Sequence, residues 1–293
     1  MLKKFSYPRR LFLGQLLLFL AACQTAKNST QKRIIMGAVS YDQGQRTIEQ
    51  YSSLIEYLGS EVKAIIELEP AYNEIKAIEQ IKRGRWSLVF APPGLAAIAI
   101  SEAQYLPLLP LEGVKSSRSV IVVLQESRTQ KLIDLEGKVL GLGQLGSAIG
   151  YYLPIYNLYG LTLAEVRFAP TPKTILQWLA SGEVAAGAMS LAEFERYRSE
   201  FSQVQFRILH TDVHEIPSGA ILVGPEVERN QQEEIRKALA VTPSSIAASA
   251  GFIPNAKVPD YQYLIEVVKR VRTIAEGVNE KPAYLFEAYK LND

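Results

Sequence analysis

The chain has 293 residues, of which 32 are lysine or arginine and 30 are aspartate or glutamate, so its formal net charge is +2. Charges of both signs are mixed along the chain, which argues against a nucleic-acid-binding surface. The single cysteine, Cys23, excludes an intramolecular disulfide and a thiolate metal cluster. The chain is long enough for one large domain or for two lobes with separate cores.

Residues 1–22 have the pattern of a secretory signal. Four basic residues precede an apolar run at 11–20, and two alanines follow before Cys23. This run is too short to cross a bilayer as a stable helix. The "LAAC" of residues 20–23 resembles the lipobox of bacterial lipoproteins, in which the cysteine is lipidated and becomes the mature N-terminus. We therefore expect an exported protein that is lipid-anchored at Cys23, on the periplasmic or extracellular face of a bacterial membrane.

Two further features accompany this signal. The "PRRLFLG" of residues 8–14 also resembles a twin-arginine export signal. Residues 24–32 are polar and lack large apolar side chains, which is typical of a flexible tether. We expect residues 23–32 to be a lipidated tether and the folded body to begin near Arg33.

From Arg33 onward, apolar β-type runs alternate with helical patterns. This alternation predicts β-α-β units and a mostly parallel sheet. The expected strands of the first series are 33–39, 62–69, 87–91 and 118–124, with a short apolar run between the last two. The expected helices are 45–59, 73–84 and 94–100.

A second series follows the apolar run at 118–124. Its expected strands are 138–143, 165–169, 183–189, 205–209 and 218–224. Its expected helices are 147–160, 172–182 and one through Glu195, before a helical C-terminal part at 226–241, 244–250 and 261–277.

Two such series suggest two lobes. We expect the first lobe to contain residues 33–118 and 223–293, and the second to contain 119–222. A return segment near 216–224 would pair with the outbound crossing near 118–124. Two parallel connections of this kind form a hinge, and the cleft between hinged lobes is where ligands bind in such folds.

A glycine-rich turn separates a predicted strand from a predicted helix. Gly141, Gly143 and Gly146 form a G-x-G-x-x-G pattern, which has three readings. A dinucleotide site needs an acidic residue at the end of the next strand, but Glu165 begins that strand. The glycines can also serve a tight turn without a ligand. In the third reading, the amides that open the following helix bind an anion, with Ser147 as N-cap or hydroxyl donor.

The run 119–161 resembles the phosphonate- and phosphite-binding periplasmic proteins of ABC importers, the PhnD-like family. The blocks "SVIVVLQESRTQKLIDLEGKVLGL", "SAIGYYLP" and "NLYGL" carry this resemblance, and further blocks match in order at 72–90, 178–189 and 251–267. The resemblance covers nearly all of the mature chain. It implies an α/β, two-lobed, type II-like periplasmic-binding-protein fold with the ligand between the lobes. It also implies a membrane permease and an ATPase as partners.

The resemblance also implies the site. The family's phosphonate-binding Ser-Thr-Ser-Gly turn corresponds to residues 147–150, where Ala148 and Ile149 replace two hydroxyl residues. Its Ser-His pair corresponds to residues 171–173, and Ala185 stands in place of an aspartate that would face an amine. The expected ligand-binding residues are Tyr72, Ser119, Gly146, Ser147, Ala148, Ile149, Gly150, Tyr151, Thr171 and Lys173.

No pattern of a catalytic site is present. The chain has no G-x-S-x-G and no H-E-x-x-H, and its two histidines, His210 and His214, fall on a predicted strand and loop. We expect a solute-binding protein that captures phosphonate, phosphite, phosphate or a related small oxyanion, without a cofactor or a metal. The alternatives are an exported nucleotide-binding enzyme that uses the glycine-rich turn, and a sensory module on the same scaffold.

Overall fold

The structure is a computed structural model that describes residues 32–39, 44–113 and 118–287. The described residues from Arg33 onward group into one compact unit. The predicted signal segment and Cys23 lie outside the described residues. The first strand begins at Lys32, beside the Arg33 at which the sequence predicts the body to start.

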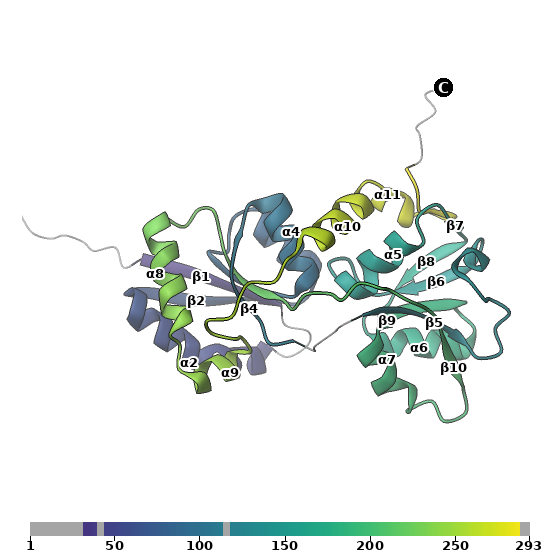
Figure 1. Cartoon of the computed structure of the whole chain (residues 1–293), viewed down its shortest axis with the longest axis horizontal. Coiled ribbons are helices and arrows are strands. Elements are labelled where there is room, and N and C mark those ends of the chain that lie inside the picture. Colours follow the sequence, from purple (N-terminus) through teal and green to yellow (C-terminus); the bar gives the residue numbers. More distant parts are fainter. Residues whose placement is uncertain (1–31, 40–43, 114–117, 288–293) are drawn as a thin grey trace, which may run out of the picture. The chain divides into compact units, whose positions relative to one another are not determined.

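The unit contains two five-stranded sheets (Figure 1). The first sheet has the order β2-β1-β3-β11-β4. Its strands are β1 (Lys32–Val39), β2 (Ala64–Ala71), β3 (Leu88–Ala91), β4 (Leu106–Pro110) and β11 (Ala220–Val223). β1 and β3 are parallel, whereas β11 is antiparallel to both of its neighbours. The expected mostly parallel sheet is thus a mixed one, because the returning strand β11 enters in the opposite direction to both of its neighbours.

Both faces of the first sheet are covered by helices. Alternate side chains of its central strands point to opposite faces. Phe90 and Ile221 pack with α2 (Gly44–Val62), α8 (Arg229–Ala240) and α9 (Ser244–Ala250), while Val89 and Leu222 pack with α3 (Glu74–Lys82) and α4 (Pro93–Ala103). This burial explains why the strand residues are apolar without a break, since each fully buried large aliphatic side chain stabilises the fold by about 1.5–3 kcal/mol.

The second sheet has the order β10-β5-β9-β6-β8. Its strands are β5 (Ser119–Leu124), β6 (Val139–Leu142), β8 (Glu165–Phe168), β9 (Ala186–Ser190) and β10 (Phe206–Thr211). β6 is parallel to β8 and β9, while β5 is antiparallel to β9 and β10, so this sheet is mixed as well. One face packs on α6 (Pro172–Ser181) and α7 (Leu191–Arg198), and η1 (Leu132–Leu135), a short 3-10 helix, precedes β6.

The chain passes between the sheets once after β4 and again before β11, and its C-terminal part returns toward the second sheet after α9. The amide of Leu111 donates to the carbonyl of Gly219 (2.8 Å), and the amide of Asp212 donates to the carbonyl of Ser119 (2.9 Å). The two crossings thus run side by side, as expected. The predicted pairing of 118–124 with 216–224 is wrong, because β5 pairs with β9 and β10, and β11 pairs with β3 and β4. β5 and β11 therefore belong to different sheets.

The helix predicted at 147–160 is two shorter pieces. A π-helical turn, η2 (Ala148–Tyr152), leads into α5 (Leu153–Asn157). Pro154 has no amide proton, so it cannot donate to the carbonyl of Gly150. That carbonyl accepts from the amide of Gly143 instead (2.8 Å). Pro154 therefore lies where the π-helical turn changes to α-helix, and the bond from Gly143 ties the first turn to the preceding strand.

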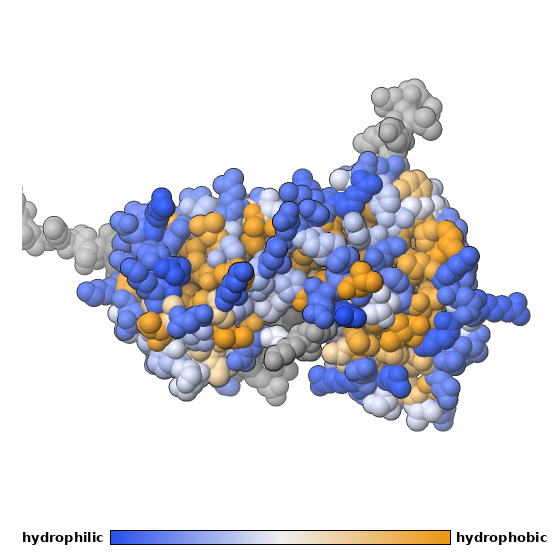
Figure 2. All heavy atoms as spheres, in the orientation of Figure 1, coloured by the Kyte–Doolittle hydropathy of each residue, from blue (hydrophilic) through white to orange (hydrophobic). Residues whose placement is uncertain are grey.

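The C-terminal part differs from the predicted first lobe. α10 (Gln262–Arg272) contacts both α4 and α5, and α11 (Ala275–Val278) follows it. β12 (Ala283–Tyr284) pairs with β7 (Thr162–Leu163), which lies between α5 and β8. The segment that ends at 287 therefore packs beside the second sheet, because its last strand finds a partner there. On the face seen in Figure 2, hydrophobic patches interrupt a largely hydrophilic surface.

Candidate functional site

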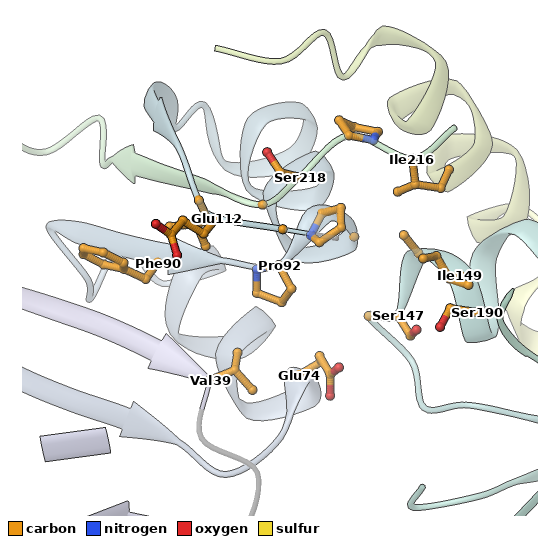
Figure 3. Close-up of a pocket in the computed structure, with 18 of the residues that line it drawn as sticks. Val39, Glu74, Phe90, Pro92, Glu112, Ser147, Ile149, Ser190, Ile216 and Ser218 are labelled. Carbon is orange, nitrogen blue, oxygen red and sulfur yellow. The ribbon is translucent and has the colours of Figure 1, made fainter. Parts of the chain in front are cut away.

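A cavity of about 560 Å³ lies where β1, β3 and the start of α4 meet the glycine-rich turn (Figure 3). We call it the central cavity. Its first wall comes from the first sheet and its helices: Val39, Glu74, Phe90, Pro92, Pro93, Gly94 and Glu112. Its second wall comes from the turn and α7: Gly146, Ser147, Ala148, Ile149, Ser190, Ala192, Glu193 and Arg196. Tyr51, Leu111, Gly113 and the crossing residues 216–219 complete the lining.

The first wall is built by a strand that ends in two prolines. Pro92 is the N-cap of α4, and Pro93 is in its first turn, where the missing amide proton costs no hydrogen bond. Gly94 follows, and its backbone lies directly against the second wall. A Cβ atom on Gly94 would be 2.0 Å from the carbonyl oxygen of Gly146 and 2.7 Å from the amide nitrogen of Ala148. Only glycine fits at this contact.

Glu74 joins the first wall at the start of α3. Asn73 is the N-cap, and its side chain accepts from the amide of Lys76 (2.9 Å), which fixes the first turn. Glu74 is only 6% exposed and packs on Gly146. Gly146 has φ +104°, and a Cβ there would lie 2.3 Å from the Cβ of Glu74. The third glycine of the motif thus serves both a left-handed turn and a close contact.

In the turn that forms the second wall, several backbone amides donate to groups of the same turn. The Oγ of Ser147 accepts from the amide of Gly150 (3.0 Å), so Ser147 is the N-cap, as predicted. The amide of Ser147 donates to the carbonyl of Gln144 (3.1 Å), and the amide of Tyr151 donates to the carbonyl of Ser147 (3.2 Å). Of the five amides at 147–151 expected to bind an anion, those of Ser147, Gly150 and Tyr151 are therefore engaged within the chain.

The start of α7 completes the second wall. Ser190 and Glu193 form a capping box, in which the Glu193 carboxylate accepts from the amide (3.0 Å) and the hydroxyl (2.7 Å) of Ser190. One turn later, Arg196 lines the cavity, and its guanidinium Cζ lies 5.2 Å from the ring centroid of Tyr197. Sequence reasoning missed Arg196 and Glu74. Glu74 follows Tyr72 at the same strand-to-helix turn, which was the available signal.

Several predicted site residues line a neighbouring cavity of about 460 Å³, which we call the side cavity. Tyr72, Ser147, Gly150 and Thr171 contribute to it, and Glu74, Ser147 and Glu193 line both cavities. Tyr72 is 70% exposed. Thr171 is the N-cap of α6, and its Oγ1 accepts from the amide of Thr174 (3.2 Å). Gly146, Ala148 and Ile149 line the central cavity, so the turn separates the two spaces.

Three other predicted residues are engaged elsewhere. Ser119 is 2% exposed, and its Oγ donates to the carbonyl of Ile149 (2.8 Å), so it supports the turn from behind. Tyr151 is buried, with its ring centroid 5.0 Å from that of Tyr152, and burial raises its pKa to about 12. The Nζ of Lys173 lies 2.6 Å from the carboxylate of Glu200. Sequence position placed these residues near the turn, but their side chains have other partners, and neither cavity is lined by them.

The glycine motif has packing roles. A Cβ on Gly141 would meet Ile175 and Val184 at 3.4–3.6 Å, and one on Gly143 would meet the backbone of Gly150 at 3.3 Å. Glu165, the nearest candidate for a ribose contact, pairs with Lys281 (2.9 Å), whose hydrogen bond lowers the pKa of the carboxyl group. Glu165, the acidic residue that a dinucleotide site would need for the ribose, is thus ion-paired with Lys281 instead.

Two further searches concern only the part of the chain that the structure describes. There, no group of three or more histidine, cysteine, aspartate or glutamate side chains is placed to hold a metal ion. None of the helices in that part is both long and apolar enough to cross a membrane.

Comparisons with known proteins agree with this architecture. A family model described as "ABC transporter, phosphonate, periplasmic substrate-binding protein" matches residues 36–251. A search of curated protein sequences finds no relative.

Solved structures with similar folds include three at low sequence identity. XAC2383 from Xanthomonas citri bound to ATP has a TM-score of 0.68 and 21% identity, over 83% of this chain and 98% of that chain. PhnD1 from Prochlorococcus marinus in complex with methylphosphonate has a TM-score of 0.62 and 15% identity, over 82% and 98%. A binding protein component of an ABC phosphonate transporter from Pseudomonas aeruginosa has a TM-score of 0.60 and 14% identity, over 85% and 89%. At these identities the likeness establishes the fold, an α/β two-lobed, type II-like binding-protein architecture with two mixed sheets.

Proposed function

The chain belongs to the family of phosphonate-binding periplasmic substrate-binding proteins of ABC transporters, and from this premise we propose that its central cavity captures a phosphonate, phosphite, phosphate or related small oxyanion. Proteins of this family are binding components of transporters, not enzymes. The captured ligand would then be delivered to a membrane permease that is driven by an ATPase.

The observation that supports this site most strongly is the cavity's second wall. The turn at 146–149 brings backbone to the cavity, and Arg196 adds a guanidinium, the side chain best suited to bind an oxyanion in a bidentate manner. The hydroxyl of Ser147 can still donate its proton to a ligand while its oxygen caps Gly150. Backbone, hydroxyl and guanidinium donors together suit a tetrahedral anion.

The first wall supports a ligand with an apolar part. Val39, Phe90 and the two prolines face the cavity, and Ile149 adds an apolar side chain from the opposite wall. A volume of about 560 Å³ falls in the range of small-molecule pockets and exceeds what a bare oxyanion fills. An organophosphonate, with an oxyanion and a carbon substituent, fits this division better than phosphate does.

Binding calorimetry on the purified protein tests the ligand class. The panel is methylphosphonate, phosphite and phosphate, with ATP added because the XAC2383 structure contains it. We expect saturable binding of at least one phosphorus oxyanion. Binding of ATP alone, or of none of the four, would reject the proposed ligand class.

A matched pair of arginine variants tests the site. Arg196→Gln should weaken binding by roughly tenfold or more, since hydrogen bonds to charged groups contribute about 1.5–3 kcal/mol. Arg198 lies on the same helix but lines neither the central nor the side cavity. Arg198→Gln should therefore bind like the wild type, and equal losses in both variants would argue against a contact between Arg196 and the ligand.

The membrane anchor rests on the sequence alone. The signal segment and the "LAAC" of residues 20–23 support lipidation at Cys23, which would hold the periplasmic protein on a membrane beside its permease. Cys23→Ser should move the protein from the membrane fraction to the soluble fraction. Mass spectrometry of the mature N-terminus should find an acyl-modified Cys23 in the wild type, and an unmodified cysteine would contradict the anchor.

A further inference from the structure

Tyr261 is a buried tyrosine whose hydroxyl is bonded to the lining of the central cavity. It directly precedes α10, and its Oη donates to the carbonyl oxygen of Ser218 (2.5 Å). Ser218 lies in the second crossing, the segment between β10 and β11, and lines the cavity (Figure 3). Tyr261 itself lines neither the central nor the side cavity. A side chain outside the site therefore holds the backbone of part of its wall.

The surroundings of Tyr261 favour this hydrogen bond. The side chain is 4% exposed and belongs to the same hydrophobic cluster as Ile216 of the second crossing. Burial raises the pKa of the hydroxyl, so it keeps its proton and remains a donor at neutral pH. Water competes little for a bond in such surroundings, and the bond therefore restrains the second crossing at Ser218.

One face of α10 is attached to the first sheet through α4. Ile265, Lys269 and Arg272 are four and three residues apart, so they lie on the same face of the helix. Ile265 and Lys269 border a pocket together with Ile100 of α4. At the end of α4, Oε2 of Glu102 lies 3.3 Å from Nη1 of Arg272. The helix that follows Tyr261 is thus attached to the first sheet.

Another face of α10 packs on the second crossing and beside α5. Tyr263 and Arg270 are two helical turns apart. The ring of Tyr263 stacks on His214 of the second crossing, with 3.8 Å between the ring centroids. Cζ of Arg270 lies 4.2 Å from the ring centroid of Tyr159, which follows α5. Figure 1 shows α10 next to both α4 and α5, so this helix contacts elements of both sheets and the crossing between them.

We propose that Tyr261 is a positioning residue for ligand binding, through which α10 holds the second crossing in the lining of the central cavity. This inference rests on the proposed oxyanion function and adds a residue that does not touch the ligand. α10 lies beyond residues 36–251, which the family model matches. Without the bond, the crossing near Ser218 leaves its position for part of the time, and the apparent affinity falls with the fraction of molecules that stays competent.

Tyr261→Phe tests this role, because it removes one oxygen atom and keeps the ring in the core. Binding calorimetry compares the variant with the wild type for methylphosphonate, phosphite and phosphate. For each of these anions that the wild type binds, the affinity should fall about fivefold or more. The factor should be the same for each anion, since a smaller competent population weakens every ligand equally. Unequal factors would indicate a direct contact with the ligand and overturn the positioning role.

Tyr105→Phe is the matched control. Tyr105 is also buried, and its Oη donates to the carbonyl of Trp86 (2.7 Å). Trp86 precedes β3, whereas the cavity lies beyond the other end of that strand, and Tyr105 lines neither cavity. Each variant loses one buried tyrosine hydrogen bond, so their melting temperatures should fall by similar amounts. Only Tyr261→Phe should lose affinity.

Hydrogen exchange of the ligand-free protein, followed by mass spectrometry, measures the restraint itself. Tyr261→Phe should speed the exchange of backbone amides in residues 213–219, because the crossing opens more often. Tyr105→Phe should leave the exchange of this segment at the wild-type rate. This measurement needs no ligand, so it examines the contact separately from the binding function.

The outcomes distinguish this inference from the proposed function. An affinity loss confined to Tyr261→Phe, together with faster exchange at 213–219, supports the inference. Wild-type affinity in Tyr261→Phe, equal affinity losses in the two variants, or unchanged exchange at 213–219 overturns the inference and leaves oxyanion binding intact. A wild type that binds none of the three anions overturns the proposed function and this inference with it.

Discussion

The two walls of the central cavity offer a ligand opposite chemistry. The first wall presents prolines, apolar side chains and the carboxylates of Glu74 and Glu112. The second wall presents backbone, the hydroxyls of Ser147 and Ser190, and the guanidinium of Arg196. They meet without intervening side chains at Gly94 and Gly146. The difference teaches that the hydrogen-bond donors and the apolar surface of the cavity come from separate parts of the fold, which suits the proposed ligand, an oxyanion with a carbon substituent.

The largest effect is expected from a substitution at Gly146 that breaks the contact between the walls. Gly146→Ala adds a Cβ that would lie 2.3 Å from the Cβ of Glu74, at a residue with φ +104°. We expect a loss of about 3 kcal/mol of unfolding free energy, together with loss of ligand binding. Denaturant unfolding measures the first quantity and calorimetry the second.

Gly182 provides the matched control for that substitution. It also has a positive φ, +78°, but a Cβ there would have no atom within 4 Å. Gly182→Ala should therefore cost only the backbone strain, about 1 kcal/mol. Equal losses in the two variants would mean that the approach of Glu74 to Gly146 contributes nothing.

The next prediction alters the first wall alone. Gly94→Ala places a methyl group 2.0 Å from the carbonyl oxygen of Gly146, so the walls must move apart. Within α4 itself alanine is at least as favourable as glycine. We expect the melting temperature to fall, because the atoms that the methyl group meets belong to the backbone. Ligand affinity should fall about tenfold or more, because fewer molecules reach the binding-competent arrangement. Unchanged affinity would show that the two walls need not approach this closely.

A smaller effect is expected behind the second wall. Ser119→Ala removes the hydroxyl that donates to the carbonyl of Ile149 in a buried environment. Leaving that carbonyl without its donor should lower the unfolding free energy by about 1–2 kcal/mol. Ser199→Ala, at an exposed hydroxyl that donates to the carbonyl of Arg196 (3.2 Å), should change it by less than about 0.5 kcal/mol. If the two losses are equal, Ser119 does not support the turn.

The smallest effect tests a residue that the sequence placed at the second wall. Lys173 forms a half-exposed ion pair with Glu200, so Lys173→Ala should change stability by less than about 1 kcal/mol. Ligand affinity should stay at the wild-type value, since neither cavity is lined by this side chain. A clear loss of affinity would mean that Lys173 contacts the ligand, as the sequence predicted.

The sequence predicted the elements better than it predicted the direction of their side chains. Apolar periodicity located nearly every strand and helix, because burial imposes that periodicity directly. The sequence predicted that three side chains near the turn contact the ligand, those of Ser119, Tyr151 and Lys173. In the structure they contact other residues of the chain instead, and some of these are distant in sequence. Pro154 was a visible signal that the hydrogen-bond pattern of the helix at 147–160 would change.

Glu74, which lines both cavities, shows the same limit. Glu74 follows an N-cap asparagine, a position where an acidic side chain is favoured by the helix dipole alone. The position of Glu74 in the first turn of α3 therefore explains why an acidic residue is present, without any ligand. Its burial against Gly146 comes from a contact between residues 72 positions apart, which no local pattern contains.

The double crossing also sets the order in which the two sheets can be completed. All strands of the second sheet lie between Ser119 and Thr211, in one uninterrupted stretch. The first sheet needs β11, so it must wait until the chain has been extended beyond Val223. Closing it joins segments more than one hundred residues apart, which is slow compared with local pairing. During synthesis the second sheet can therefore form first. Until β11 is available, β3 and β4 of the first sheet lack the strand that pairs with both of them.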